Sequence, residues 1–206
     1  NNKFDILKKF KVQIVFSVNY KIRLSDTLLK SFKHGVINIH LGDLPRYRGN
    51  ATPNWAILNN EKKIPICFHK MSDKIDEGLI AKKIFFKISQ KTYVGDIYDW
   101  TNKIVPKELF KLFKMFMKKK VILKKQKGRP LIVFPRKDID SKIDWKKSTS
   151  DIFNIVRASS TPFKGAYCFF EKKKLRIFEC EIYKPNYEFF AIPGQVCLVK
   201  NSNPVI

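Results

Sequence analysis

The 206-residue chain has little acidic charge, no paired cysteine motif and no long apolar stretch. Its four cysteines include no CxxC pair, which excludes a zinc knuckle or a redox dithiol of that spacing. No apolar run approaches the roughly 18 residues of a membrane-spanning helix, and we expect no secretory leader. These absences favour reduced thiols in a cytoplasmic protein.

Basic charge is abundant, with 42 Lys and Arg against 18 Asp and Glu and a formal net charge of +24. Such an excess attracts phosphate-bearing partners, whether nucleic acid, nucleotide or acidic membrane. Much of it lies in residues 103–137, called the basic stripe below, where thirteen basic residues accompany one acid, Glu108. A stripe of this kind is either the solvated face of an amphipathic helix or a phosphate-facing surface.

The remaining composition is that of a globular protein. Hydrophobic residues make up 44% and aromatic residues 14% of a 24.2 kDa chain, enough to build a substantial core. The chain begins at Asn1 and stops at Ile206, soon after an apparent strand at residues 195–199. We therefore expect a fragment that is truncated at both ends.

The first half alternates between β-branched runs and helical patterns. Apolar runs at residues 12–18, 36–41, 64–71 and 79–88 predict strands, and residues 24–32 and 52–60 predict helices. Thr52 is a candidate N-cap for the second helix, with Pro53 as its first residue. This succession predicts an α/β fold with a Rossmann-like, mostly parallel sheet.

The second half changes character. Helical spacing extends over residues 96–120 and is followed by a basic linker at 124–140. A further helix begins at Ser148 or Ser150, before short strands at 166–170, 175–183 and 195–199. We predict a catalytic domain over 1–123, the linker over 124–140, and an incomplete β-rich domain resembling an OB barrel over 141–206.

Three polar residues are candidates for a site. Asn38 and His40 lie at the end of a predicted strand, where α/β sheets place their ligands, and residues two apart point the same way. Asp76 lies in a turn before the fourth strand. Taken singly, each of these residues is more often structural than functional.

The joint pattern resembles the folate-dependent formyltransferases, a family that includes methionyl-tRNA and sugar N-formyltransferases. The motifs of the first half are Asn38-x-His40, Leu44-Pro45-x-Tyr47-x-Gly49 and Asp76-x-Gly78. Those of the second half are Ile143-Asp144-Trp145, Ile152-x-Asn154-x-Val156-Arg157-Ala158 and Pro162-Phe163-x-Gly165-Ala166. The similarity covers nearly the whole chain.

The resemblance implies that Asn38, His40 and Asp76 form a catalytic triad. In this family the triad moves a formyl group from 10-formyltetrahydrofolate to a primary amine, without a metal. The residue types fit the chemistry, because the amide and the imidazole can donate hydrogen bonds to the developing oxyanion. The carboxylate can orient the imidazole and relay the proton that the amine releases.

The same resemblance assigns two further groups of residues. Ile22 and Leu24 would lie in the loop that meets the pterin, and the turn from Asp73 to Asp76 would close its other side. Arg46, Tyr47 and Arg48 would either contact an anionic acceptor or hold their loop in place. The family commonly has a serine two residues after the histidine, but this chain has Gly42.

Two acceptors fit the resemblance. The segments at 50–57 and 159–163 look more like enzymes that formylate a nucleotide-linked 4-amino-4,6-dideoxy sugar, which we favour. The basic stripe instead suits methionyl-tRNA, through neutralisation of phosphates. A non-catalytic RNA-binding protein is a remote alternative. The sequence does not decide whether the protein forms a homodimer.

Overall fold

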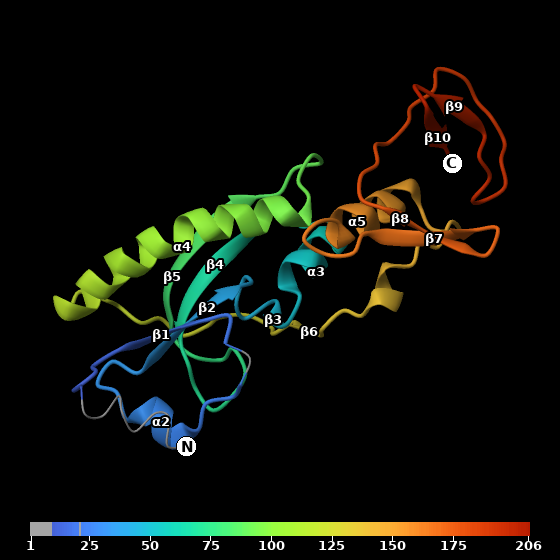
Figure 1. Ribbon diagram of the computed structural model, residues 1–206. Helices are drawn as coiled ribbons and strands as arrows, with labels where there is room; N and C mark the ends of the chain where they lie inside the picture. The colour runs from blue at the N-terminus through green and yellow to red at the C-terminus, as the bar shows by residue number, and fades with distance from the viewer. Residues whose placement is uncertain (1–9, 21) are drawn as a thin grey trace.

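The computed structural model describes residues 10–20 and 22–206, and its centre is a four-stranded sheet (Figure 1). The strands are β1 (Val15–Val18), β2 (Val36–Leu41), β4 (Lys63–Lys70) and β5 (Ile80–Lys87), in the order β1-β2-β4-β5. β1 runs parallel to β2, whereas β4 is antiparallel to both β2 and β5. Each strand lies within or close to a predicted apolar run, which confirms the α/β class.

The sheet is mixed rather than mostly parallel, which corrects one part of the prediction. The helix between β2 and β4 is α3 (Thr52–Leu58), with 7 residues. At 1.5 Å per residue it is about 10 Å long, whereas the 6 residues of β2 extend about 20 Å. The chain re-enters the sheet near the end of β2, where Leu41 pairs with Ile66, and β4 runs back along it.

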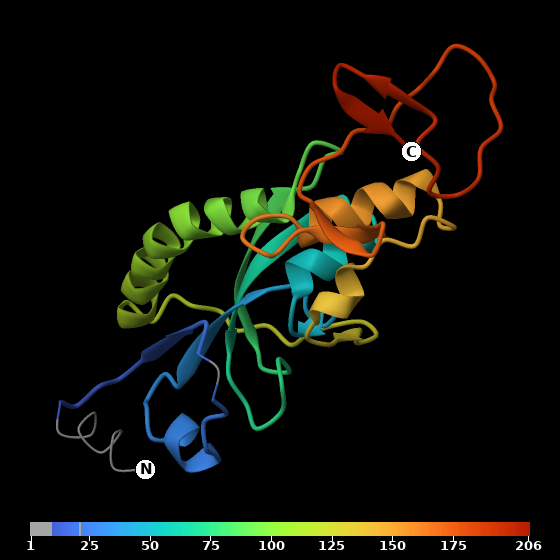
Figure 2. The same ribbon diagram turned by 45° about the vertical axis from the view of Figure 1, so that its right-hand side comes forward.

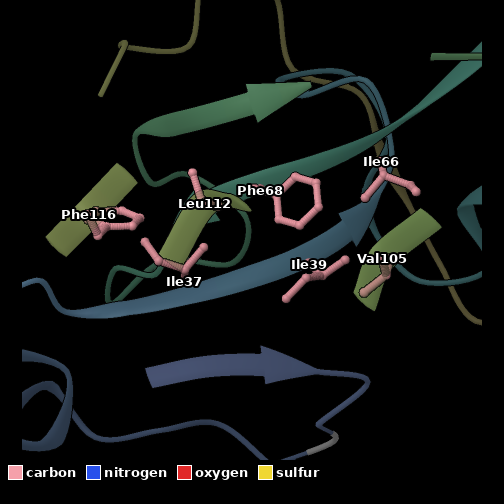
Figure 3. Close-up of a cluster of buried hydrophobic side chains, with 7 residues drawn as sticks. All are labelled: Ile37, Ile39, Ile66, Phe68, Val105, Leu112 and Phe116. Atoms are coloured by element: carbon pink, nitrogen blue, oxygen red, sulfur yellow. The ribbon is translucent and has the colours of Figure 1, made fainter. Parts of the chain in front are cut away.

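A long helix, α4 (Val94–Met117), covers one face of the sheet (Figures 1 and 2). Figure 3 shows the core between them, formed by Ile37, Ile39, Ile66 and Phe68 from the sheet and Val105, Leu112 and Phe116 from α4. Pro106 lies inside this helix without ending it. The predicted helix is confirmed, and the lysines of the basic stripe lie on its exposed side.

The two short helices begin in different ways. In α2 (Asp26–Lys30), the Ser25 side chain accepts a hydrogen bond from the backbone of Leu28 and caps the helix. The N-cap of α3 is Ala51, with a φ of 54°, and not Thr52 as predicted. The Thr52 hydroxyl instead donates to the backbone oxygen of Leu41, so it ties the helix to the end of β2.

The basic linker packs against the first half of the chain. Its strand β6 (Ile132–Val133) pairs in parallel with β3 (Arg48–Gly49), and the 3-10 helix η2 (Asp138–Ser141) follows. Beyond it, α5 (Thr149–Ser159) is capped by Ser148, one of the two predicted candidates. Asn54 of α3 donates to the backbone oxygen of Ala158 in α5 at 2.7 Å. Residues on both sides of the predicted linker thus share a buried contact.

The last part of the chain is β-rich, as predicted, but it does not close a barrel. β7 (Ala166–Phe170) pairs with β8 (Lys173–Ile177), and β9 (Leu198–Lys200) pairs with β10 (Asn203–Val205). These are two separate two-stranded sheets (Figure 1), whereas an OB barrel has five strands. Strand β8 ends at Ile177, so the predicted strand over residues 175–183 extended too far. In the described part of the chain, no helix is both long and apolar enough to cross a membrane.

The packing of α4 on the sheet gives a first prediction. Leu112→Ala should lower the free energy of unfolding by about 2–5 kcal/mol, because it leaves a cavity in the core, where Leu112 is only 1% exposed. Phe110→Ala is the matched control on the same helix, since Phe110 is 58% exposed. Its expected cost is at most about 1 kcal/mol, from the contact of Lys114 with its ring. Urea unfolding of both variants measures the difference, and equal losses would contradict this packing.

Candidate active site

The side chains of Asn38 and His40 project from the face of the sheet opposite α4. Ile37 and Ile39 belong to the core beneath that helix, and side chains alternate along a strand. Asn38 is half-buried and pairs in register with His69 of β4, and His40 is 7% exposed. The two polar residues therefore share one side of the sheet, as the spacing predicted.

The His40 imidazole is held as one neutral tautomer. Its Nε2 lies 2.6 Å from the backbone oxygen of Tyr47, and because a carbonyl only accepts, Nε2 carries the hydrogen. Its Nδ1 lies 3.6 Å from Oδ2 of Asp76, beyond a good hydrogen bond. Burial lowers the pKa of His40 and outweighs the Asp76 charge and the Tyr47 contact, which raise it. The neutral ring thus presents an unprotonated Nδ1 to the carboxylate.

Gly42 stands where the family commonly has a serine, two residues after the histidine, and the structure shows why a glycine fits there. A Cβ at this position would lie 2.4 Å from Nε2 of His40 and 2.5 Å from the Tyr47 backbone oxygen. Both distances are shorter than any van der Waals contact allows. The hydrogen bond between His40 and Tyr47 therefore occupies the space in which the family's serine would begin.

Asp76 is a buried carboxylate with three partners. Its Oδ2 accepts a hydrogen bond from the Gly49 backbone at 2.9 Å, and its Oδ1 lies 3.3 Å from Nε2 of His69. Burial alone raises the pKa of Asp76, but contacts with His69, His40 and the Gly49 N–H together bring it below the usual value. The side chain is 10% exposed and stays ionised at neutral pH.

The turn that carries Asp76 depends on a glycine and on a residue of the linker. Asp76 itself has a φ of 53°, in the left-handed region. A Cβ on Gly78 would lie 1.5 Å from the backbone oxygen of Lys70, so no other residue fits there. The Gln126 amide donates to the backbone oxygens of Asp76 at 2.6 Å and of Gly78 at 2.9 Å.

The loop residues 46–48 mostly hold one another in place. Arg48 donates to Glu77 at 2.6 Å and to Gln126 at 2.8 Å, and only 11% of its side chain is exposed. The Tyr47 hydroxyl donates to Glu61 at 2.6 Å, and burial together with this contact raises the pKa of Tyr47 to about 12. Arg46 is exposed and also pairs with Glu61. Of the two interpretations of this loop, the geometry favours positioning over contact with an acceptor.

The segments expected around the pterin lie close together. Arg23 donates to the backbone oxygen of Asp73, and a cavity of about 520 Å³ is lined by Arg23, Leu24, Ser25, Asp26 and Asp73. It is an open hollow at the surface and not an enclosed pocket. Leu24 and Asp73 are thus brought together, whereas the Ile22 side chain is 67% exposed and does not line the cavity.

His69 and Gln126 are site residues that the sequence alone did not reveal. His69 lies inside a run that predicts an apolar strand, although it is one of only three histidines in the chain. Because histidine is so rare in this chain, each histidine is a candidate for the site. Gln126 lies between lysines in the linker, and nothing in a single sequence marks it.

A buried carboxylate, two imidazoles and a carboxamide on one side of an α/β sheet define a site suited to acyl-type group transfer. The formyl transferase family model matches residues 2–111, and the model of the formyl transferase C-terminal domain matches residues 136–206. The chain therefore belongs to the formyl transferase family, which confirms the resemblance found in its sequence.

The chain is also similar to an individual member of this family. It is 32% identical over 203 residues to the bifunctional polymyxin resistance protein ArnA of Wigglesworthia glossinidia brevipalpis, covering 98% of this chain and 30% of that protein. The chain thus spans less than a third of that relative.

Two solved structures are similar to this one. Methionyl-tRNA formyltransferase from Clostridium thermocellum has a TM-score of 0.72 and 19% identity, over 87% of this chain and 77% of that one, which shows a shared fold. The sugar 3N-formyl transferase WlaRD, solved in the presence of dTDP and 5-N-formyl-THF, has a TM-score of 0.61 and 27% identity. That match covers 72% of this chain and 56% of the other.

The linker contact gives a second prediction. Gln126→Ala should lower the free energy of unfolding by about 1–3 kcal/mol, because two partly buried carbonyls lose their donor. Lys125→Ala, at the exposed neighbouring position, should leave stability within about 0.5 kcal/mol. Chemical unfolding measures both, and a neutral Gln126→Ala would show that the linker does not hold the Asp76 turn.

The neutral state of His40 gives a third prediction. Its folded pKa is lowered by burial, whereas an unfolded histidine titrates near about 6.5. Between the two values the unfolded state binds more protons, so the free energy of unfolding should fall as the pH drops below about 6.5. Urea unfolding at several pH values should show this slope in the wild type and a flatter one in His40→Gln. An unchanged slope in the variant would rule out His40 as its source.

Proposed function

We propose that this protein transfers a formyl group from 10-formyltetrahydrofolate to the amine of a nucleotide-linked 4-amino-4,6-dideoxy sugar. The observation that carries the proposal is the ionised Asp76 carboxylate, buried beside His40 and on the same side of the sheet as Asn38. A carboxamide donor, a neutral imidazole and a carboxylate are the groups that attack of an amine on a formyl carbon requires.

We place the formyl donor in the open cavity between residues 23–26 and Asp73. Leu24 offers an apolar surface, while the backbone and Asp73 offer hydrogen-bonding groups for the edge of a flat heteroaromatic ring. The similar enzyme WlaRD was solved in the presence of 5-N-formyl-THF, which supports a folate in this family. When bound, the donor supplies the formyl group.

The site residues then have distinct tasks. The Asn38 amide can donate a hydrogen bond to the oxygen on which negative charge develops, where losing one donor typically costs about 3–4 kcal/mol. Asp76 can accept the proton that the amine releases, directly or through water, and can return a proton to the donor's leaving nitrogen as its bond to the formyl carbon breaks. The Nδ1 atom of His40 carries no hydrogen and faces Asp76 at 3.6 Å, so the two groups can share that proton. The hydrogen on Nε2 of His40 is donated to the Tyr47 backbone oxygen. His40 can bind the oxyanion only if Nε2 releases Tyr47 and donates to the oxyanion instead.

The choice of a sugar acceptor is supported by where the basic stripe lies. Its α4 lysines are exposed on the outer side of that helix, whereas Asn38 and His40 lie on the opposite face of the sheet. A small nucleotide-linked sugar needs no contact with that surface. The 27% identity to the sugar 3N-formyl transferase, over 72% of this chain, also supports a sugar acceptor.

Methionyl-tRNA is the second candidate. The linker half of the stripe includes exposed Lys125 and Lys127 on either side of Gln126, which contacts the Asp76 turn. These lysines are placed to meet phosphates of an acceptor that enters the site. A non-catalytic RNA-binding role is less favoured, because it gives no reason for a buried ionised carboxylate between two imidazoles.

A parallel assay gives the fourth prediction. The complete protein is offered 10-formyltetrahydrofolate with the nucleotide-linked amino sugar or with methionyl-tRNA, and formylated product is followed by mass spectrometry. We expect formylation of the sugar, and a loss of turnover of about 10²–10⁴-fold in Asp76→Asn. Asp99→Asn, exposed on α4, is the control and should keep the wild-type rate.

The outcomes separate the candidates. Formylation of methionyl-tRNA alone would replace the sugar by the tRNA as acceptor, and its rate should fall steeply with added salt. Formylation of neither acceptor, together with salt-sensitive RNA binding, would favour the RNA-binding alternative. A fully active Asp76→Asn would show that the assigned role of this carboxylate is wrong.

A further inference from the structure

His69 is a buried histidine whose polar contacts all lie within the candidate site or at its edge. It is 2% exposed, and its Nδ1 lies 3.2 Å from the backbone oxygen of Lys70. Its Nε2 lies 3.3 Å from Oδ1 of Asp76 and also 3.3 Å from Nδ2 of Asn38. The ring meets that of His40 edge-on, with centroids 6.2 Å apart. Among the residues that the structure describes, His69 is therefore the one side chain with polar contacts to both Asn38 and Asp76.

The position of His69 is fixed by the sheet. The pairing of β2 with β4 places it directly opposite Asn38, and the preceding Phe68 is fully buried in the core beneath α4. The pairing of β4 with β5 shifts register between Phe68 and His69. Such bulges re-aim side chains and are common next to active sites. The imidazole is thus directed by backbone geometry and has little freedom to move.

The partners of His69 determine where its hydrogens lie. The Lys70 backbone oxygen and the ionised Asp76 carboxylate can only accept hydrogen bonds. The contact between Nε2 and Asp76 is therefore a hydrogen bond only when Nε2 carries a hydrogen.

This hydrogen placement has a consequence for Asn38. An N–H on Nε2 of His69 repels the amide N–H groups of Asn38 and attracts the amide oxygen. Half a turn of the amide exchanges the two atoms, so that Oδ1 faces His69 and Nδ2 faces the open side of the site. The N–H groups of Asn38 are then available to a developing oxyanion.

We propose that His69 is a positioning residue, which holds the Asp76 carboxylate and turns the Asn38 amide so that it donates into the site. This inference rests on the proposed formyl transfer. Without the N–H of His69, the Asn38 amide is free to present its oxygen to the reacting oxygen, and the two would repel each other. The loss should affect the chemical step and leave acceptor binding unchanged.

Two substitutions separate this role from packing. A Gln side chain places its amide nitrogen near the position of the imidazole Nε2, whereas an Asn side chain places it near Nδ1. His69→Gln therefore keeps donors for Asp76 and Asn38, and His69→Asn keeps only the contact with Lys70. The pair is matched, because each variant is a neutral carboxamide in the same strand.

The expected result is a difference between the two variants in kcat. His69→Asn should lower kcat at least about tenfold, and His69→Gln should stay within about threefold of the wild type, with KM for the acceptor little changed in both. Equal effects of the two variants on kcat, or a change confined to KM, would overturn the inference.

A measurement that needs no activity tests the same placement. Nitrogen-15 NMR of the wild type should show a hydrogen on Nε2 of His69, and His69→Asn should change the Asn38 side-chain amide resonances more than His69→Gln does. A His69 ring without a hydrogen on Nε2 would overturn the inference even if a variant failed to fold. Failure of the proposed function is a distinct outcome, in which the wild type formylates no amine while these spectra stay as expected.

Discussion

The site is organised by a single buried carboxylate that must stay ionised. Removing a charge from water is costly unless hydrogen bonds and opposite charge replace the solvent. Asp76 accepts a hydrogen bond from Gly49 of β3, contacts His69 of β4 and lies beside the neutral His40 of β2. Since each partner comes from a different element, the charge is stable only when the sheet register and the adjoining loops are in place together.

The same constraint explains why the linker belongs to the site. The turn at residues 73–78 carries the carboxylate with a left-handed residue, and its backbone oxygens need donors. Gln126 supplies two of them, and the pairing of β6 with β3 fixes the linker beside Gly49. A segment with the composition of a flexible connector is therefore held by specific contacts, and it links the first half of the chain to α5 and the strands beyond.

The sheet also separates the two features that point to different acceptors. One face is closed by α4, which carries exposed lysines on its outer side, and the other face carries Asn38 and His40. A macromolecular acceptor that used the α4 lysines would have to reach around the sheet to place its amine. A small acceptor needs only the face that holds the site, and this geometry therefore favours a sugar acceptor over a macromolecular one.

The sequence by itself determined the strands, the long helix and the identity of the polar residues at the end of β2, because periodicity and residue type act locally. Spacing alone also placed Asn38 and His40 on one face. Only the tertiary structure decided that β4 runs antiparallel beside β2, which sets His69 opposite Asn38. It likewise brought Gln126 to the Asp76 turn across 50 residues of sequence. These contacts depend on strand order and chain reversal, and no local pattern of residues encodes either one.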